Sequence, residues 1–204
     1  MRVLPCGPDA VLVEVDSLDE VLGFDAAARA ADIAGITETV PAARTVLVRF
    51  DPHATGADFL RARLTRLRWA PRAPEDGPLV EIPVRYDGSD LDEVAQALGI
   101  DVAEVIERHT AAAWRVGFVG FAPGFAYLVG GGDGLRVPRR TSPRVQVPAG
   151  SVALADEYCG IYPRASPGGW QLLGTTDASL WDPSRAEPAL LVPGTRVRFV
   201  AVGR

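Results

Sequence analysis

Lysine is absent from this sequence of 204 residues, and cysteine and histidine occur only twice each. A Walker-type phosphate loop ends in Lys-Ser or Lys-Thr, so the glycines of Gly130–Gly134 do not form one. All the side-chain cations except histidine are arginines, and a bound carboxylate or phosphate would be held by planar guanidinium groups or by backbone N–H groups. We therefore interpret Gly130–Gly134 as a surface turn.

The other scarcities exclude further classes of protein. Cys6 and Cys159 are too few and too far apart for a disulfide framework, and His53 and His109 lack the spacing of a metal site, so we expect a reduced compartment and no bound metal. No apolar run is long enough to span a bilayer, and the first residues lack signal-peptide features. The net charge of -5 argues against nucleic acid as a partner. We expect a soluble, cytoplasmic protein without membrane contacts.

What is present favours two domains of α+β class, since 48% of the residues are hydrophobic and domains commonly have about 100–150 residues. Strand and helix patterns alternate between residues 11 and 86 in the order strand, helix, strand, strand, helix, strand, which is typical of a ferredoxin-like domain. The last strand, 79–86, could equally open the next domain. The Pro-rich stretch Ala70–Pro78 is a predicted linker. We therefore place the domains at 1–78 and 79–204.

Residues 115–181 are dense in Gly, Pro, aromatic residues and Arg, which predicts short strands joined by loops. A compact β-barrel or sandwich suits this pattern. We expect a functional site on its loops, because repeated turns gather flat side chains and cations.

Two clusters in this region are candidates for ligand binding. Arg139, Arg140 and Arg144 place three cations within six residues, which implies either solvation at the surface or a bound carboxylate or phosphate. The segment from Ser166 to Trp170 offers a hydroxyl, an approachable backbone at two glycines and a stacking ring, although the ring could instead anchor the core. The candidates here, with two pocket-lining aromatics, are Ser166, Gly168, Gly169, Trp170, Phe125 and Tyr162.

His109 shares one helical face with Val102, Val105 and Ile106, so it points toward the core. A buried, hydrogen-bonded structural histidine is one interpretation. The other is a pocket-lining ring that moves a proton near neutral pH.

Several motifs occur in an order that resembles a known family: GFAPGFAYL (120–128), PRR and PR (138–144), VPAGSVA (147–153), GIYP (160–163) and SPGGWQLLG (166–174). Together with GPDAVLVEV (7–15) and the span 36–52, they closely resemble the B component of 5-oxoprolinase, a family also described as allophanate hydrolase subunit 1 or KipI-like proteins. The resemblance implies a cyclophilin-like barrel over 79–204. It departs at Gly130–Gly134 and at Cys159, where the family often has threonine.

The resemblance also implies a function. The chain would be one part of a complex that uses ATP, with or without magnesium, to convert 5-oxoproline to glutamate. The chain would be inactive alone. Its partners would be a KipA-like protein, the C component, with which it shares a composite site, and a LamB/YcsF-like protein, the A component. His109 and Arg140 would be catalytic, while Arg139 and Arg144 would bind substrate or nucleotide.

Two alternatives stay open at this point. A KipI-like protein could be a binding module that inhibits a sensor histidine kinase. A carboxyltransferase-type protein would act on biotin carried by another chain, since a chain without lysine cannot carry biotin itself.

Overall fold

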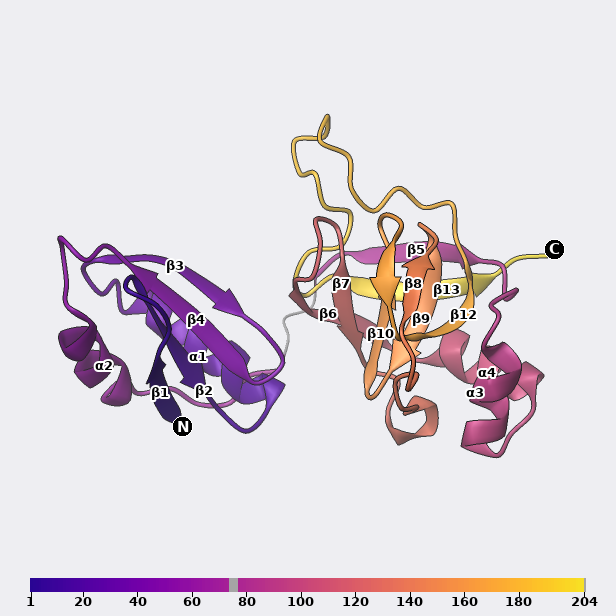
Figure 1. The fold of residues 1–204 in the computed structure, drawn as a ribbon, viewed down its shortest axis with the longest axis horizontal. Coiled ribbons are helices and arrows are strands. Elements are labelled where there is room, and N and C mark those ends of the chain that lie inside the picture. Colours follow the sequence, from indigo (N-terminus) through magenta and orange to yellow (C-terminus); the bar gives the residue numbers. More distant parts are fainter. Residues whose placement is uncertain (74–76, 204) are drawn as a thin grey trace. The chain divides into compact units, whose positions relative to one another are not determined.

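The computed structural model describes residues 1–73 and 77–203, and the chain forms two compact units, Met1–Pro74 and Glu75–Arg204 (Figure 1). The predicted linker Ala70–Pro78 lies partly outside the described residues, and the boundary expected after residue 78 stays a prediction.

The first unit is a four-stranded antiparallel sheet with two helices. Its elements are β1 (Arg2–Pro5), β2 (Ala10–Glu14), α1 (Leu18–Ala30), β3 (Ile36–Pro41), β4 (Thr45–Phe50) and α2 (Ala57–Thr65), and the strand order is β1-β2-β4-β3. Ser17 begins α1, because its side-chain oxygen accepts a hydrogen bond from the Glu20 N–H at 3.2 Å. The strands and helices predicted between residues 11 and 67 are thus confirmed.

The ferredoxin-like order is not confirmed. The predicted last strand is β5 (Leu79–Val84), which belongs to the second unit and pairs in parallel with β13 (Arg196–Ala201). The edge position beside β2 is taken instead by β1, which forms a hairpin with β2. The alternative, that this strand opens the next domain, is the correct one.

Alternation along the strands places the core of the first unit on one face of its sheet. Helix α1 packs against β3 and β4, and α2 against β1 and β2. The buried side chains between these layers are Val11, Val13, Val15, Val21, Phe24, Ala28, Ile33, Val46, Val48, Phe50, Leu60 and Leu64.

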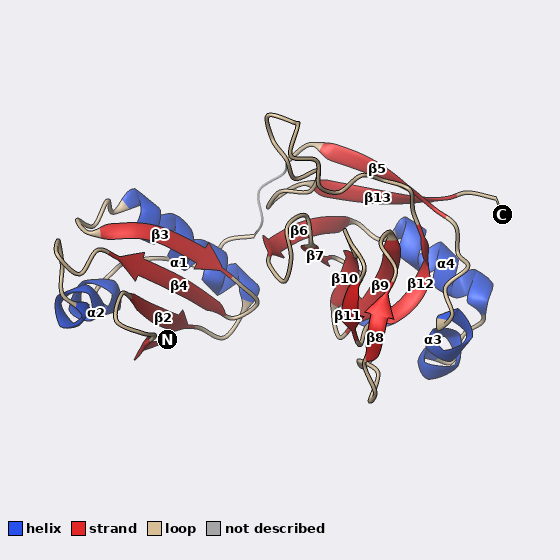
Figure 2. Ribbon diagram, turned by 45° about the horizontal axis from the view of Figure 1, so that its top comes forward, coloured by secondary structure: helices blue, strands red, loops and turns tan. Residues whose placement is uncertain are grey.

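The second unit contains a seven-stranded sheet that curls into a nearly closed barrel, as expected from its short strands and frequent turns. Its remaining elements are α3 (Leu91–Leu98), α4 (Val102–Ala111), β6 (Trp114–Val119), β7 (Ala126–Val129), the 3₁₀ turn η1 (Asp133–Leu135), β8 (Arg144–Val147), β9 (Ser151–Ala155), β10 (Tyr158–Ile161), β11 (Ser166–Gly168) and β12 (Gln171–Thr175). The order in the large sheet is β12-β9-β10-β7-β6-β13-β5, and β8 pairs separately with β11 (Figure 2).

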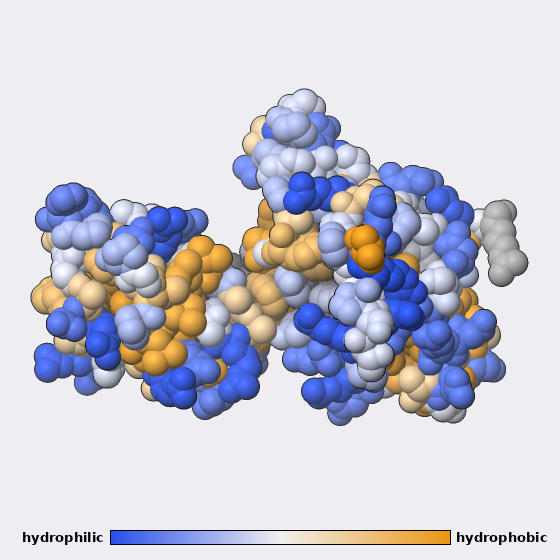
Figure 3. Space-filling view, in the orientation of Figure 1, coloured by the Kyte–Doolittle hydropathy of each residue, from blue (hydrophilic) through white to orange (hydrophobic). Residues whose placement is uncertain are grey.

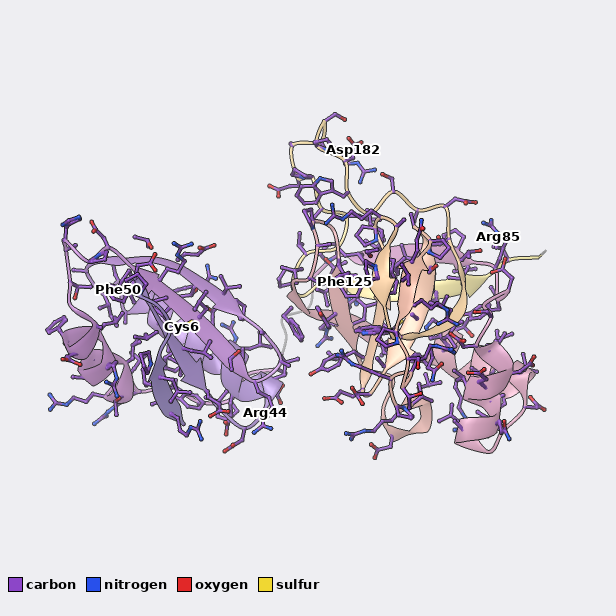
Figure 4. The ribbon with its side chains drawn as sticks, in the orientation of Figure 1. Cys6, Arg44, Phe50, Arg85, Phe125 and Asp182 are labelled. Carbon is purple, nitrogen blue, oxygen red and sulfur yellow. The ribbon has the colours of Figure 1, made fainter. Side chains whose placement is uncertain are left out.

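An isolated bridge between the end of β12 and the residue after β5 nearly closes the barrel. The backbone N–H of Arg85, just after β5, donates to the Thr175 carbonyl at 2.9 Å, and Thr175 N–H donates back at 2.8 Å. Gly174 permits this approach, since a Cβ there would lie 2.1 Å from the Arg85 carbonyl oxygen. The Arg85 side chain, labelled in Figure 4, pairs outside the barrel with Asp177 at 2.8 Å.

The two helices of the second unit follow the predicted start and stop signals. Gly99 ends α3 with a left-handed φ of 69°, and the side chain of Asp101 accepts from the Glu104 N–H at 2.8 Å to begin α4. Helix α3 packs against β12, and α4 packs against β13. In the described parts of the chain, no helix combines the length and apolar character needed to cross a membrane.

Candidate functional site

A pocket of about 120 Å³ lies in the second unit, between the β6–β7 loop, the segment before β8 and the turn between β11 and β12. Its lining residues are Phe121, Phe125, Tyr127, Arg139, Tyr162, Pro167, Gly168, Gly169 and Trp170. The structure therefore brings together six of the residues that the sequence nominated for ligand binding. Their role in binding stays a prediction.

The aromatic residues of this pocket line it and also pack together in a small hydrophobic core. Phe125, labelled in Figure 4, lies 5.5 Å from each of the Tyr162 and Trp170 rings, in edge-to-face geometry. All three side chains are buried, and they pack with Val147 beneath the pocket. Trp170 is thus part of a small core, as one of its two interpretations expected, and its role as a binding surface stays a prediction.

Gly168 has a steric reason to be glycine. A Cβ at this position would lie 2.2 Å from the Tyr162 hydroxyl oxygen, whereas a Cβ at Gly169 would meet nothing closer than 3.7 Å. The carbonyl of Gly169 instead accepts a hydrogen bond from the Arg140 N–H at 2.8 Å. The glycine pair therefore lets Tyr162 approach the backbone and fastens the turn to the segment before β8.

Phe121 stands at the edge of the pocket in a strained backbone conformation. Its φ is 65°, in the left-handed region that costs a bulky residue on the order of 1–3 kcal/mol, and 59% of the residue is exposed. Its ring lies 5.2 Å from Phe125 and 6.2 Å from Tyr162. The loop thus holds an exposed aromatic ring beside the pocket.

Arg139 is the cation that lines this pocket. Its guanidinium carbon lies 5.9 Å from the centre of the Trp170 ring, and its Nε lies 3.5 Å from Asp156 Oδ2. The side chain is 58% exposed, so this ion pair is solvated and weak. A ligand carboxylate could replace Asp156 at little cost.

The two tyrosines of the pocket stay neutral at physiological pH. Burial raises the pKa of Tyr162, opposed by the backbone hydrogen bond from Trp170 and by Arg139. Burial likewise raises the pKa of Tyr127, again opposed by Arg139. The pocket therefore combines neutral phenols and apolar rings with one positive charge, which suits a small anion with a flat apolar body.

Arg140 and Arg144 lie beside the pocket but do not line it. Both pair with the buried carboxylate of Asp90: Arg140 Nη1 lies 2.8 Å from Oδ1, and Arg144 Nη2 donates to the same oxygen. Arg140 also contacts Glu93, and Arg144 contacts the Ser89 hydroxyl at 3.1 Å. The predicted catalytic role of Arg140 is not tested by this geometry, which uses its guanidinium to bind protein carboxylates.

Ser166 and Asp90 lie outside the lining of the pocket. Ser166 lies on β11 but does not line the pocket, and its hydroxyl donates to the Arg164 carbonyl at 3.3 Å. Asp90 was not among the candidates. The cluster of arginines could have pointed to it, because arginines that pack against a protein interior require a carboxylate as a counter-charge.

His109 is completely buried in the barrel core. Its Nδ1 lies 2.7 Å from the Tyr86 hydroxyl and its Nε2 lies 3.3 Å from Cys159 Sγ. Burial lowers the pKa of His109 to about 3 and raises that of the Cys159 thiol, so both groups stay neutral. This geometry favours the structural interpretation of His109, and its catalytic role stays a prediction.

An apolar groove of about 400 Å³ adjoins the pocket and shares Phe121 and Phe125 with it. It is lined by residues 119–125 and by Trp181, Ala189, Leu191, Val192 and Pro193. Four of the large apolar residues are exposed there: Val119, Phe121, Trp181 and Val192. Figure 3 shows apolar surface, in orange, where the β6–β7 loop lies in Figure 1. Exposed apolar surface of this kind is typical of an interface.

Comparison with known proteins identifies the family. The model of the "Carboxyltransferase domain, subdomain C and D" family matches residues 1–191. The chain belongs to this family. It is 43% identical over 180 residues to the B subunit of 5-oxoprolinase from Escherichia coli O157:H7, an alignment that covers 85% of this chain and 82% of that protein. The resemblance found in the motifs is thus confirmed.

Solved structures agree with this assignment. The crystal structure of TTHA0988 is 37% identical, with a TM-score of 0.78, and the match covers 96% of this chain but only 40% of that chain. The urea amidolyase of K. lactis matches 98% of this chain and 15% of its own length with a TM-score of 0.81. At 20% identity, this second likeness shows the fold alone.

Proposed function

We propose that this chain is the B component of an ATP-dependent 5-oxoprolinase and that the aromatic pocket binds the substrate. The observation that carries the proposal is the single cation, Arg139, beside neutral aromatic walls, in a carboxyltransferase-family chain similar to the B subunit of 5-oxoprolinase. 5-Oxoproline is a small flat ring with one carboxylate. Arg139 would bind that carboxylate, and the rings of Tyr162 and Trp170 would hold the lactam ring.

The size of the pocket supports the substrate rather than the nucleotide as its ligand. Pockets for drug-sized ligands have about 300–1,000 Å³, so a pocket of about 120 Å³ suits a single-ring acid and is too small for ATP. ATP, with or without magnesium, would therefore bind mainly on another protein of the complex. A composite site shared with a KipA-like C component satisfies this requirement.

Opening the lactam at the expense of ATP also needs groups that bind the nucleotide. Transfer of the γ-phosphoryl group to the lactam oxygen makes the carbonyl carbon electrophilic, and overall 5-oxoproline, ATP and two waters yield glutamate, ADP and phosphate. This chain would bind and orient the acid, while the partner brings the nucleotide. We therefore expect the chain to be inactive alone.

The apolar groove is the surface we propose for the KipA-like partner. It shares two aromatic residues with the pocket, so a partner bound there would lie next to the substrate. TTHA0988 extends well beyond the region matched by this chain, which leaves room for an adjoining domain in that protein. The LamB/YcsF-like A component would complete the assembly.

The test is ATP-dependent release of glutamate from 5-oxoproline by the chain mixed with candidate LamB/YcsF-like and KipA-like proteins. We expect Arg139→Gln to raise the KM for 5-oxoproline about tenfold, since a charge-assisted hydrogen bond contributes about 1.5–3 kcal/mol and this site is partly solvated. Arg136→Gln is the matched control, because Arg136 is exposed and does not line the pocket.

Each outcome has a clear meaning. Glutamate release by the mixture, with a raised KM only for Arg139→Gln, supports the proposal. No glutamate release by a well-folded mixture refutes it and favours the KipI-like function, a module that inhibits a sensor histidine kinase through the apolar groove. Carboxyl transfer from biotin on another chain would instead support the carboxyltransferase alternative.

A further inference from the structure

Asp90 is a buried carboxylate that the proposed function does not use. Its side chain is 1% exposed, and both oxygens have partners: Oδ1 accepts from Arg140 and Arg144, and Oδ2 accepts from the Leu172 N–H at 2.7 Å. A buried charge is stable only when it is paired in this way. Although Asp90 directly precedes α3, its side chain does not cap the helix.

The carboxylate fixes the beginning of β12 relative to the turn after β5. The Asp90 N–H donates to the Leu172 carbonyl at 3.2 Å, and the Leu172 N–H donates to the Asp90 side chain, so the two residues bind each other twice. Leu172 is two residues from Trp170, which forms a wall of the pocket. Through its two hydrogen bonds to Leu172, Asp90 therefore fixes the backbone next to Trp170.

The same carboxylate fixes the segment that carries Arg139. Arg140 and Arg144 both pair with Asp90, while the Arg140 N–H binds the Gly169 carbonyl at 2.8 Å. Arg139 and Arg140 make contacts with different groups: Arg140 reaches Asp90, and Arg139 reaches the Trp170 ring. Two neighbouring cations are in this way assigned to different partners.

We infer that Asp90 is a positioning residue for substrate binding, which keeps the guanidinium groups of Arg140 and Arg144 out of the pocket lining and holds Arg139 and Trp170 in it. The role in substrate binding rests on the proposed function. Without the carboxylate, Arg144 loses its counter-charge and Arg140 keeps its contact with Glu93 alone, so the two guanidinium groups would repel Arg139 or compete with it for the substrate carboxylate. Asp90 thus determines which of the three arginines meets the ligand.

The first experiment is independent of catalysis. Hydrogen–deuterium exchange on the full chain would follow peptides that contain the amides of Arg140 and Leu172. We expect Asp90→Asn to speed exchange at both by at least about tenfold, because the ion pairs that hold the segment are lost. Asp92→Asn is the matched control, since Asp92 is an exposed acid in the first turn of the same helix. Unchanged protection in Asp90→Asn, with the fold intact, overturns the positioning role.

The second experiment is a double-mutant cycle in the reconstituted assembly, with KM for 5-oxoproline as the readout. If Asp90 acts through Arg139, the effect of Arg139→Gln falls from about tenfold to less than about threefold in the Asp90→Asn background. Additive effects would mean that Asp90 only stabilises the fold, and would overturn the inference. Asp90→Glu restores the charge and should recover part of the lost affinity.

The two proposals fail in different ways. An inactive wild-type assembly with fast exchange in Asp90→Asn refutes the 5-oxoprolinase function and leaves the loop-positioning role supported. An active assembly with unchanged exchange and additive KM effects supports the 5-oxoprolinase function and refutes the positioning role of Asp90.

Discussion

Replacing Gly168 by alanine tests whether the contact with Tyr162 defines the pocket. The new methyl group would lie 2.2 Å from the Tyr162 hydroxyl oxygen and 2.8 Å from its Cζ, well short of an ordinary contact of 3.4–4 Å. Tyr162 is only 2% exposed and packs against Phe125, so it cannot turn away freely. Overpacking of this kind typically costs about 1–3 kcal/mol.

The neighbouring glycine provides the matched control. A methyl group at Gly169 would meet its nearest neighbours at 3.7 Å, an ordinary contact. We expect Gly169→Ala to change the free energy of unfolding by less than about 1 kcal/mol, while Gly168→Ala lowers it by about 1–3 kcal/mol. Urea denaturation followed by tryptophan fluorescence would measure both variants.

A second substitution identifies the atom responsible. Tyr162→Phe removes the hydroxyl oxygen at 2.2 Å, so in a Gly168→Ala background it should restore part of the lost stability, although the ring carbon at 2.8 Å still crowds the methyl group. Equal destabilisation by the two glycine variants, or no relief from Tyr162→Phe, would show that this contact does not shape the pocket.

Two further predictions concern the core and the groove. Because the pKa of His109 is about 3 in the folded chain and about 6.5 when unfolded, the unfolded state binds more protons between these values, and stability falls as the pH falls from about 6.5 toward 3. From pH 7 to pH 5 this loss is on the order of 2 kcal/mol, measured by urea denaturation at each pH. His109→Gln should flatten the slope, and an unchanged slope would contradict the burial argument. Trp181→Asp should weaken association with a KipA-like protein at least about tenfold in a titration, whereas Val145→Asp, at an exposed site outside the groove, should not; equal affinities would exclude the groove as the interface.

Local signals predicted much of the fold and of the pocket. The capping residues Ser17 and Asp101 and the terminating Gly99 act within one helical turn, so their effect is readable from neighbouring residues. The pocket residues were also predictable, because their types already specify walls, turns and charge. What the sequence could not show is which ring is buried and which is exposed.

Short length and long-range pairing account for the errors. Strand β1 forms a local hairpin with β2, but at four residues it is too short for its pattern to stand out. Strand β5 is paired with a strand more than a hundred residues later, so no local pattern assigns it to its sheet. Asp90 was missed for the same reason: before a helix it resembles an exposed cap, but its partners lie 50 and more residues away. The burial of His109 was expected from its helical face, but its partners, Tyr86 and Cys159, come from distant segments and were not predicted.

The pairing of β5 with β13 also determines when the barrel can be completed during synthesis. Leu79 aligns with Arg196 and Val84 with Ala201, so the first strand of the barrel has no neighbour in its sheet until the last strand leaves the ribosome. Joining segments this far apart carries a large entropic cost, and such contacts form late. Until then β5 presents an open edge to other chains. The second unit should therefore depend for its folding on synthesis through β13, and it is the part of the chain most exposed to aggregation until that strand is made.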